Sequence, residues 1–332
     1  MYEQKFHTAD ISKSSFLVTG GAGFIGSNIV EYLLKNNAGK VRVLDNFSTG
    51  SRENIQPFLG NPAFELIEGD IRSLEICRKS VDGIDYLSHQ AALGSVPRSI
   101  NDPLTSNEVN VSGFLNMLVA ARDAKVRKMV YAASSSTYGD HPGLPKVEDQ
   151  IGNPLSPYAV TKYVNELYAN VFSSNYDFHA LGFRYFNVFG PRQNPKGPYA
   201  AVIPLFIECA LKNEAPYING DGETSRDFTF VENAVQANIK GLLAEDIKKH
   251  EVINIAFGER TTLNELWKEI SETAGITLKP GYRESRKGDV KHSLANIDKA
   301  AGLIGYHPGI SVKKGLGLAF DWYRQNLMVI SR

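Results

Sequence analysis

The chain has 332 residues, of which 42% are hydrophobic and 22% charged, as is typical of a globular protein with a sizeable core. Lysine plus arginine and aspartate plus glutamate number 36 each, so bulk charge favours neither nucleic acid nor an anionic membrane as a partner. Cys77 and Cys209 lie in no CxxC pattern, and we expect neither a disulfide framework nor a metal site. Residues 1–14 are polar, unlike a signal peptide, and no stretch approaches the ~20 apolar residues that span a bilayer. We therefore expect a cytoplasmic protein.

Short apolar runs alternate with helical patterns along the first 190 residues. The predicted strands cover residues 16–18, 41–45, 64–70, 84–89, 128–133 and 179–184. The predicted helices begin near Gly23 and cover residues 73–81, 103–124 and 157–173. This alternation predicts an α/β fold of the Rossmann type, a doubly wound parallel sheet with helices on both faces. Ligands of such sheets bind beyond the carboxyl ends of the strands.

A glycine-rich turn, Thr19–Gly26, joins the first predicted strand to the first predicted helix. Gly20, Gly23 and Gly26 permit a tight turn, close approach of the backbone to a pyrophosphate, and packing of helix on strand. The N–H groups at the start of the helix can then bind phosphate oxygens. A glycine cluster alone is also typical of an ordinary turn, but the strand before it and the helix after it favour a dinucleotide site.

Acidic residues end the second and third predicted strands. Asp45 suits the ribose hydroxyls of adenosine and repels a 2′-phosphate, which favours NAD over NADP. Arg42 and Arg52 are near in sequence and weaken that preference, and the alternative for Asp45 is a turn residue. Asp70 either meets the adenine amino group or caps the helix that follows, and both roles remain open.

Tyr158 and Lys162 are four residues apart in a predicted helix and therefore share a face. The lysine ammonium favours the phenolate, so a tyrosine, which normally titrates near ~10, can act as acid or base near neutral pH. Ser134, Ser135 and Ser136 directly follow the fifth predicted strand and can bridge a substrate to Tyr158. The alternatives are an amphipathic helix with a chance tyrosine and lysine, and a polar loop.

The glycine motif, the serine cluster before Tyr138 and the Tyr-x-x-x-Lys pair together resemble the extended short-chain dehydrogenase/reductase family, from about Ser14 to Arg332. The resemblance implies bound NAD, with Tyr158 as catalytic base, Lys162 orienting the nicotinamide ribose and Ser134 relaying the proton. Residues 89–92, which read His-Gln-Ala-Ala, depart slightly from the common HxAA motif of the family by their Gln90. Besides Tyr158 and Lys162, the implied cofactor contacts are Gly20, Gly23, Phe24, Ile25, Gly26, Asp45, Asn46, Ser48, Thr49, Gly50, Asp70, Ile71, Gln90, Ala91 and Ala92.

The sequence changes in character after about Gly190, where prolines and glycines crowd one stretch and the predicted elements become shorter. We expect an N-terminal extension over 1–14, an NAD-binding domain over 15–190 and a smaller α/β substrate domain over 191–332. Segments near 229–256 are expected to complete the NAD-binding domain.

The reaction is indicated by the residues around the serine cluster. The family's dehydratases and decarboxylases resemble one another in an acidic residue just after the active serine or threonine, whereas residues 134–138 hold no carboxylate. The pattern is similar to that of the UDP-sugar 4-epimerases. The implied mechanism oxidises C4 by hydride transfer to tightly bound NAD while Tyr158 takes the hydroxyl proton. The 4-keto sugar then rotates, and hydride returns to its opposite face.

The resemblance also places the UDP-sugar. Arg226 and Arg286 match positions that grip the diphosphate, for which the fork of arginine is suited, and solvated surface arginines are the alternative. Ser293 stands where family members restricted to UDP-glucose and UDP-galactose have a tyrosine, and a serine leaves room for a 2-acetamido group. The other implied contacts are Asn187, Ala201 and Val202, with Tyr217 and Asn219 in the uracil pocket.

Two further stretches, 92–99 and 133–140, closely resemble the UDP-N-acetylglucosamine 4-epimerases of bacterial surface-polysaccharide pathways. That group implies that Gly94, Ser95, Ser135 and Ser136 hold the N-acetyl end of the sugar, so UDP-GlcNAc and UDP-GalNAc are the expected substrates. The alternatives are a UDP-glucuronate or UDP-glucose 4-epimerase, a UDP-sugar dehydratase or decarboxylase, and a non-catalytic NAD-binding regulator.

The resemblance implies a homodimer, in which the helices over 103–124 and 157–173 form a four-helix bundle with those of a second copy. An apolar stripe on the second of these helices, from Val160 to Val171, fits that packing and fits burial within one chain equally well.

Overall fold

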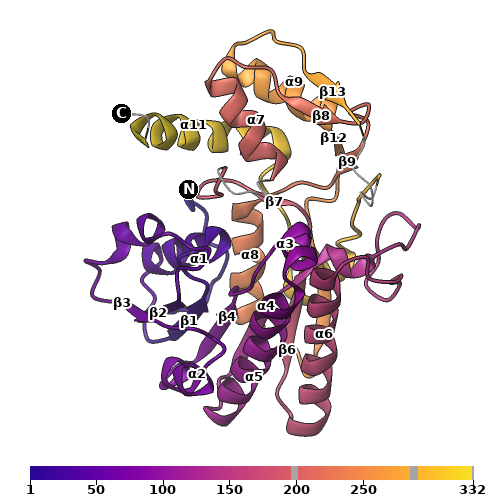
Figure 1. The fold of residues 1–332 in the computed structure, drawn as a ribbon. Coiled ribbons are helices and arrows are strands. Elements are labelled where there is room, and N and C mark those ends of the chain that lie inside the picture. Colours follow the sequence, from indigo (N-terminus) through magenta and orange to yellow (C-terminus); the bar gives the residue numbers. More distant parts are fainter. Residues whose placement is uncertain (196–200, 285–290, 331–332) are drawn as a thin grey trace.

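The computed structural model describes residues 1–195, 201–284 and 291–330. A seven-stranded parallel sheet forms its centre, with the strand order β11-β6-β5-β4-β1-β2-β3 (Figure 1). The strands are β1 (Ser15–Thr19), β2 (Lys40–Asp45), β3 (Phe64–Glu68), β4 (Tyr86–His89), β5 (Lys128–Ser134), β6 (Ala180–Tyr185) and β11 (Glu251–Ile255). The predicted Rossmann-type sheet is confirmed, and each of the six predicted strands lies within two residues of its expected ends.

Helices cover both faces of the sheet because its strands are apolar on both sides. Phe16 and Val18 of β1 join one buried cluster, whereas Leu17 between them joins another. The first cluster is closed by α1 (Phe24–Lys35) and α8 (Val231–Leu242), and the second by α2 (Leu74–Val81), α5 (Phe114–Asp123) and α6 (Pro157–Tyr176). Each large side chain buried in these clusters contributes roughly 1.5–3 kcal/mol.

The helix predicted over 103–124 is divided by a wider turn. It consists of α4 (Pro103–Asn107), a π-helical turn over Glu108–Gly113, and α5. Within the turn, the buried Asn110 accepts a hydrogen bond from Leu93 N at 2.7 Å and donates to Thr161 Oγ1 at 3.1 Å. The short helix α3 (Val96–Asn101), which was not predicted, precedes α4 and is capped by the Ser95 side chain.

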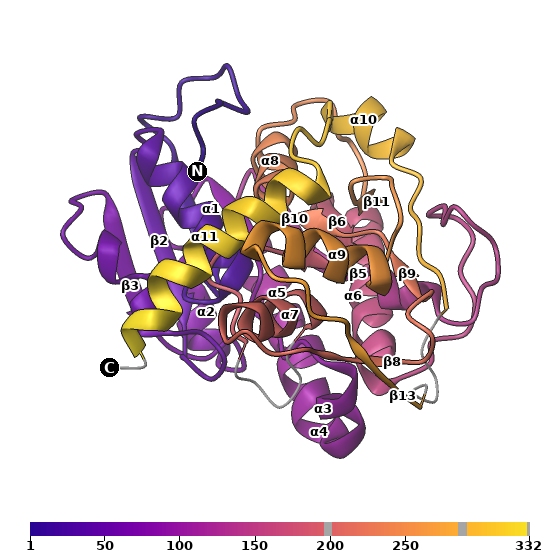
Figure 2. The same cartoon turned by 90° about the horizontal axis from the view of Figure 1, so that it is seen from above.

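A second layer lies above the carboxyl ends of the strands (Figure 1). There α7 (Val202–Leu211), α9 (Leu263–Ala274) and α11 (Val312–Ile330) enclose a separate core that includes Phe206, Trp267 and Tyr323. Viewed from above, α9 and α11 run across the body of the molecule (Figure 2). The remaining elements are β7 (Val188–Phe189), β8 (Tyr217–Asn219), β9 (Ser225–Arg226), β10 (Thr229–Phe230), β12 (Thr261–Thr262), β13 (Gly281–Arg283) and α10 (Asp298–Ile304).

Residues 1–14 are folded onto the sheet layer, although their sequence is polar overall. Tyr2, Phe6 and Ile11 are buried, and the ring of Phe6 stacks on Tyr32 of α1 with centroids 5.0 Å apart. Met1 packs against both the cluster under α1 and the core of the upper layer. The segment therefore joins the two layers. Among the residues in the described ranges, no helix is both long and apolar enough to cross a membrane.

Candidate active site

A pocket of about 370 Å³ runs along the carboxyl ends of the strands from β2 to β6. Asp45 lies at its β2 end, and Ser134 and Tyr158 lie at its β5 and β6 end. The pocket brings together most of the residues implied as cofactor contacts, which come from five separate stretches of chain. The predicted residues that line it are Gly20, Gly23, Phe24, Ile25, Gly26, Asp45, Asn46, Ser48, Thr49, Asp70, Ile71, Gln90, Ala91, Ala92, Gly94, Ser134, Tyr158, Lys162 and Asn187.

The glycine turn lines the pocket on one side, and on the other it packs so closely on neighbouring backbone that side chains would not fit. Gly20 has a φ of +67°, and a Cβ there would lie 2.8 Å from Ala91 N. A Cβ on Gly26 would collide with the carbonyl oxygen of Gly20. No described side chain caps the start of α1, so its first N–H groups are directed into the pocket without a side-chain partner. A pyrophosphate fits this combination of bare backbone and free donors.

Asp45 is held in place from both sides at the end of β2. Its buried carboxylate accepts from Ala22 N at 2.9 Å and from Phe47 N at 2.8 Å. Burial raises the pKa of Asp45, and these N–H groups oppose that rise. Arg52 pairs with Glu68 at 2.6 Å. The Arg42 guanidinium also has other partners, because it bonds Glu65 and the carbonyl oxygens of residues 80 and 82. Neither arginine is therefore directed to a 2′-phosphate, and the donor set fits NAD.

Asp70 does not cap a helix, so that alternative is wrong. Ser73 caps α2, accepting from Ile76 N, while Asp70 accepts from Arg72 N at 2.8 Å and from Asn46 Nδ2 at 2.9 Å. The Arg72 side chain bonds Asp70 and lowers the pKa of its carboxyl. A role beside adenine stays a prediction.

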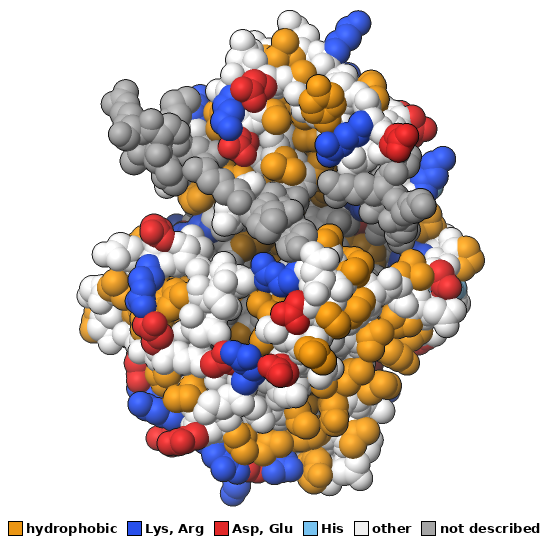
Figure 3. All heavy atoms as spheres, viewed as in Figure 1, with side chains coloured by type: hydrophobic (Ala, Val, Ile, Leu, Met, Phe, Trp, Pro, Cys, Tyr) orange, Lys and Arg blue, Asp and Glu red, His pale blue; other side chains and the backbone are white. Residues whose placement is uncertain are grey.

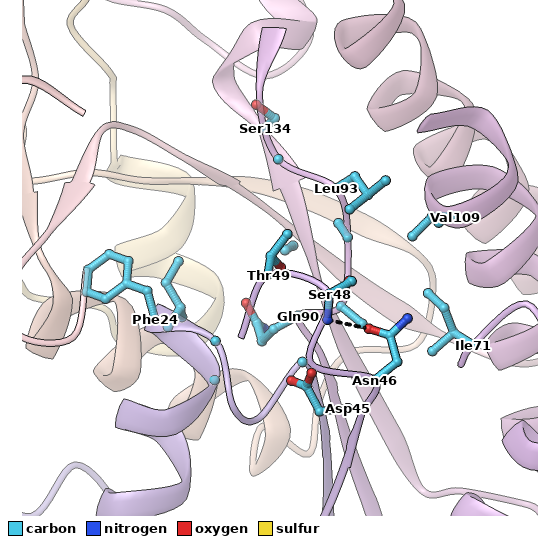
Figure 4. A pocket seen from close by; sticks show the side chains of 18 of the residues that line it. Phe24, Asp45, Asn46, Ser48, Thr49, Ile71, Gln90, Leu93, Val109 and Ser134 are labelled. Atoms are coloured by element: carbon cyan, nitrogen blue, oxygen red, sulfur yellow. Dashed lines mark hydrogen bonds between the residues drawn. The ribbon is translucent and has the colours of Figure 1, made fainter. Parts of the chain in front are cut away.

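An apolar wall stands next to Asp70. Ile71, Leu93 and Val109 lie on the same side of the pocket, across from Phe24 (Figure 4). Leu93 and Val109 were not predicted, because the π-helical turn that carries Val109 and binds Leu93 has no clear sequence signal. The wall suits the flat apolar faces of a base. Leu44, Gly69, Ala132, Ala133, Tyr185 and Val188 also line the pocket and were not predicted. Tyr185 could have been found, since it follows the sixth predicted strand as Ser134 follows the fifth.

Tyr158, Lys162 and Ser134 meet at the other end of the pocket. Lys162 Nζ lies 5.9 Å from the centroid of the Tyr158 ring and donates to Ala132 O at 2.6 Å. Burial lowers the pKa of Lys162 to about 8. Burial also raises the pKa of Tyr158, whereas a hydrogen bond from Ser134 lowers it. Ser134 Oγ in turn accepts from Ser136 Oγ at 2.8 Å, which leaves its own proton for Tyr158. Ser136, Ser134 and Tyr158 thus form a chain of hydroxyls suited to moving one proton.

The residues implied as substrate contacts lie in the upper layer and the loops beneath it. Ser293 N donates to Ser225 O at 3.1 Å, which sets Ser293 beside β9 and Arg226. Asn187 Nδ2 donates to the carbonyl oxygen of Asp227 at 3.3 Å. Ala201 and Val202 lie at the start of α7, Tyr217 and Asn219 on β8, Ser95 at the start of α3, and Ser135 and Ser136 in the turn after β5. Apart from Asn187, these residues do not line the pocket, nor does Gly50, and Arg286 lies outside the described residues.

Comparison with known proteins places this site in a family. Residues 16–256 match the NAD dependent epimerase/dehydratase family. The UDP-glucose 4-epimerase of Mycolicibacterium smegmatis is 34% identical over 310 residues, covering 93% of this chain and 98% of that protein. A UDP-N-acetylglucosamine 4-epimerase from Methanobrevibacter ruminantium, solved with UDP-N-acetylmuramic acid, superposes with a TM-score of 0.88 at 38% identity, over 94% and 98% of the two chains. A Thermus thermophilus UDP-glucose 4-epimerase solved with NAD gives 0.83 at 34% identity, over 94% and 99%.

Proposed function

The chain belongs to the NAD dependent epimerase/dehydratase family and is an NAD-dependent UDP-sugar 4-epimerase, and we propose that its substrates are UDP-GlcNAc and UDP-GalNAc. The observation that carries this proposal is the pairing of residues 291–293 with β9, which sets Ser293 next to Arg226. At that position a serine leaves space for a 2-acetamido group beside a cation suited to the diphosphate.

We propose that each of the two layers binds one of the two molecules. Residues 15–190, completed by 229–256, hold NAD, and residues 191–332 hold most of the UDP-sugar. NAD, when bound, supplies a reversible hydride acceptor for the sugar C4. Gly20, Gly23 and the start of α1 would hold its pyrophosphate and Asp45 its adenosine ribose.

Proton transfer falls to the chain's own side chains. Tyr158 Oη takes the proton of the 4-hydroxyl and returns it after the keto sugar has turned. Lys162 stabilises the phenolate by its charge and, through its bond to Ala132 O, keeps a fixed place beneath the tyrosine. Ser134 donates to Tyr158 and links it to Ser136, so the proton has a hydroxyl route within the site.

A dehydratase or decarboxylase is disfavoured by the position of the carboxylates. Among the described residues that line the pocket, the acidic ones are Asp45 and Asp70, at the end remote from Tyr158. Asp140, the first carboxylate after the serine cluster, is exposed and accepts from Asn153 N at 2.7 Å. The described lining residues beside Tyr158 therefore include no carboxylate that could remove a proton from C5 or expel a 6-hydroxyl. The complete set of Ser134, Tyr158 and Lys162 argues against a non-catalytic regulator.

A neutral sugar is favoured over a uronic acid. Lys162 is the cation among the described lining residues, and its ammonium is already bonded to the backbone. Ser134, Gly94 and Asn187, which line the same pocket, offer hydroxyl and amide groups. A glucuronate carboxylate would find no described cation here, whereas an N-acetyl group needs only such neutral donors and acceptors.

We also propose that the protein is a homodimer. The apolar stripe of α6 is not buried within its own chain, because Val160 and Leu167 are 48% and 49% exposed. On the neighbouring α4, Leu104 is 77% exposed. Hydrophobic side chains gather where α6 lies on the surface (Figure 3). A second copy packing its own α4 to α6 on this face would cover them, as the implied four-helix bundle requires.

The function is tested with purified protein, no added cofactor, and UDP-GlcNAc or UDP-glucose as substrate. We expect UDP-GalNAc to form much faster than UDP-galactose. Ser293→Tyr should remove most activity on UDP-GlcNAc and leave that on UDP-glucose. Tyr158→Phe should lower kcat by about 10²–10⁴, whereas Tyr176→Phe, at the exposed end of the same helix, should leave it unchanged. If neither sugar is epimerised even with NAD supplied, the epimerase assignment is wrong for these substrates.

A further inference from the structure

Three side chains from distant parts of the chain form a closed ring of hydrogen bonds at the wall of the pocket. Gln90 Nε2 donates to Asn238 Oδ1 at 3.0 Å, Asn238 Nδ2 donates to Tyr185 Oη at 2.7 Å, and Tyr185 Oη donates to Gln90 Oε1 at 3.3 Å. Every member donates once and accepts once around the ring. Because all three bonds run in the same direction around the ring, flipping either amide would break two bonds. The ring therefore fixes the orientation of both amides.

The ring spans the strands that flank the catalytic serine. Gln90 directly follows β4, Tyr185 ends β6, and β5, which carries Ser134, lies between them. Asn238 reaches the ring from α8, which packs against β4 and β5. Gln90 and Tyr185 line the same pocket as Tyr158 and Lys162, whereas Asn238 is fully buried behind them.

Further bonds anchor the ring to the sheet and to α8. Ser88 Oγ of β4 donates to Asn238 Oδ1 at 3.0 Å, and Asn238 Nδ2 also donates to Ala234 O at 2.8 Å. Gln90 Nε2 lies 2.9 Å from Ser88 Oγ. Tyr185 remains a neutral donor, since burial raises its pKa well above the ordinary tyrosine value. Its role is therefore different from that of Tyr158, the other tyrosine of the pocket.

We propose that Gln90 and Asn238 are positioning residues that act through Tyr185 to shape the end of the pocket that holds the redox half of the dinucleotide. The opposite end holds Asp45, which is suited to the adenosine ribose, so the end beside Ser134 and Tyr158 is left for the nicotinamide half. The proposal rests on the proposed roles of Asp45 and Tyr158. It adds that the wall facing the reacting half is set by a hydrogen-bonded ring of three side chains.

Breaking the ring should affect the cofactor and leave the sugar nucleotide unaffected. Each lost member leaves a buried amide or hydroxyl without its partner, and that group regains a partner only by moving. None of these hydrogen bonds of the ring and its anchors reaches Arg226, Asn219 or Ser293. Binding of NAD and kcat should therefore fall together, whereas KM for the UDP-sugar should stay within twofold.

The test uses Tyr185→Phe, Gln90→Leu and the double variant, each stripped of nucleotide and titrated with NAD alone. We expect the Kd for NAD to rise about tenfold in each single variant, because each loses two bonds of the ring and the groups that face the cofactor can then move. The double variant should lose no more NAD affinity than the weaker-binding single variant, because both substitutions break the same ring. Tyr131→Phe is the matched control. It removes a buried hydroxyl bonded to His250 Nε2 at 2.9 Å, outside the pocket lining, so it should lower stability and leave the Kd for NAD unchanged.

Two results would overturn the proposal. One is a Kd for NAD within twofold of the parent protein in both single variants, even if their stability falls as much as that of Tyr131→Phe. The other is a double variant whose loss of NAD affinity equals the product of the two single losses. Because these titrations contain no UDP-sugar, they stay valid if the chain epimerises a sugar other than UDP-GlcNAc. Failure of the proposed substrate and failure of the ring are thus separate outcomes.

Discussion

Replacing Lys162 should make the nucleotide-free protein more stable. Lys162 is 3% exposed, and burial lowers its pKa from 10.5 to about 8. With about 1.4 kcal/mol for each tenfold change in proton affinity, keeping this ammonium charged in the fold costs about 3 kcal/mol at neutral pH. Lys162→Met keeps an unbranched chain of similar length and removes the charge. It also removes the bond to Ala132 O, worth roughly 1 kcal/mol, so the net gain is about 2 kcal/mol.

The sign of the pH dependence follows from the lowered pKa. Below pH 8 the folded and unfolded states both hold the proton, and the full cost of the buried charge is present. As the pH rises from about 8 to 10.5, folded Lys162 loses its proton while the unfolded chain keeps it, so the wild type becomes more stable relative to the variant. The advantage of Lys162→Met should therefore be complete at pH 7 and gone by pH 10.

The assay is thermal unfolding of protein stripped of nucleotide. For a chain of 332 residues, a gain of about 2 kcal/mol corresponds to a Tm higher by ~3 °C. The control Lys79→Met removes an exposed lysine of α2 and should leave Tm unchanged. Excess NAD should raise the Tm of the wild type far more than that of Lys162→Met. A variant that melts below the wild type at pH 7, or an advantage that persists at pH 10, would refute the reasoning.

Three further changes test other parts of the structure. Gly26→Ala places a Cβ against the carbonyl oxygen of Gly20 and so distorts the glycine turn that is suited to the pyrophosphate. The purified variant should therefore contain no NAD, which is checked by denaturing the protein and measuring the absorbance of the released nucleotide. Glu166→Gln leaves the buried Arg184 without its carboxylate partner at 2.7 Å. It should lower the free energy of unfolding in urea by about 3–5 kcal/mol, and a loss below 1 kcal/mol would contradict that. Phe6→Ala should cost roughly 3 kcal/mol in the same assay with kcat unchanged; a lower kcat at full stability would give the segment a catalytic role.

The sheet and the chemical groups of the site were predictable because both are encoded locally. Apolar runs followed by glycine, aspartate or serine mark where parallel strands end, and those ends meet at one edge whatever connects them. The spacing of Tyr158 and Lys162 is likewise a property of one helix. These local signals account for the match between the predicted strands and β1 to β6.

The parts that could not be predicted depend on contacts between distant residues. Gln90, Tyr185 and Asn238 are separated by up to 148 positions, and no local sequence pattern predicts that their side chains are in contact. In the π-helical turn, Asn110 bonds Leu93 and Thr161 of α6, which are distant in sequence, whereas the turn's own sequence resembles that of an ordinary helix. The helix predicted over 157–173 is confirmed as α6, but only the structure distinguishes an apolar stripe facing solvent from one facing the core.

The folded unit of this chain begins upstream of the region that matches the family, because residues of the N-terminal segment are buried in it. The family match begins at residue 16. Upstream of it, Tyr2 donates to Asn28 Oδ1 at 2.7 Å, and Asn28 Nδ2 donates to Pro191 O at 3.2 Å, where the chain passes between layers. A protein that began at the first matched residue would lose the side chains that cover Tyr32 and the link from Tyr2 through Asn28 to Pro191. The part of the chain that carries the family match and the part that folds as one unit are therefore different, and expression limits should follow the second.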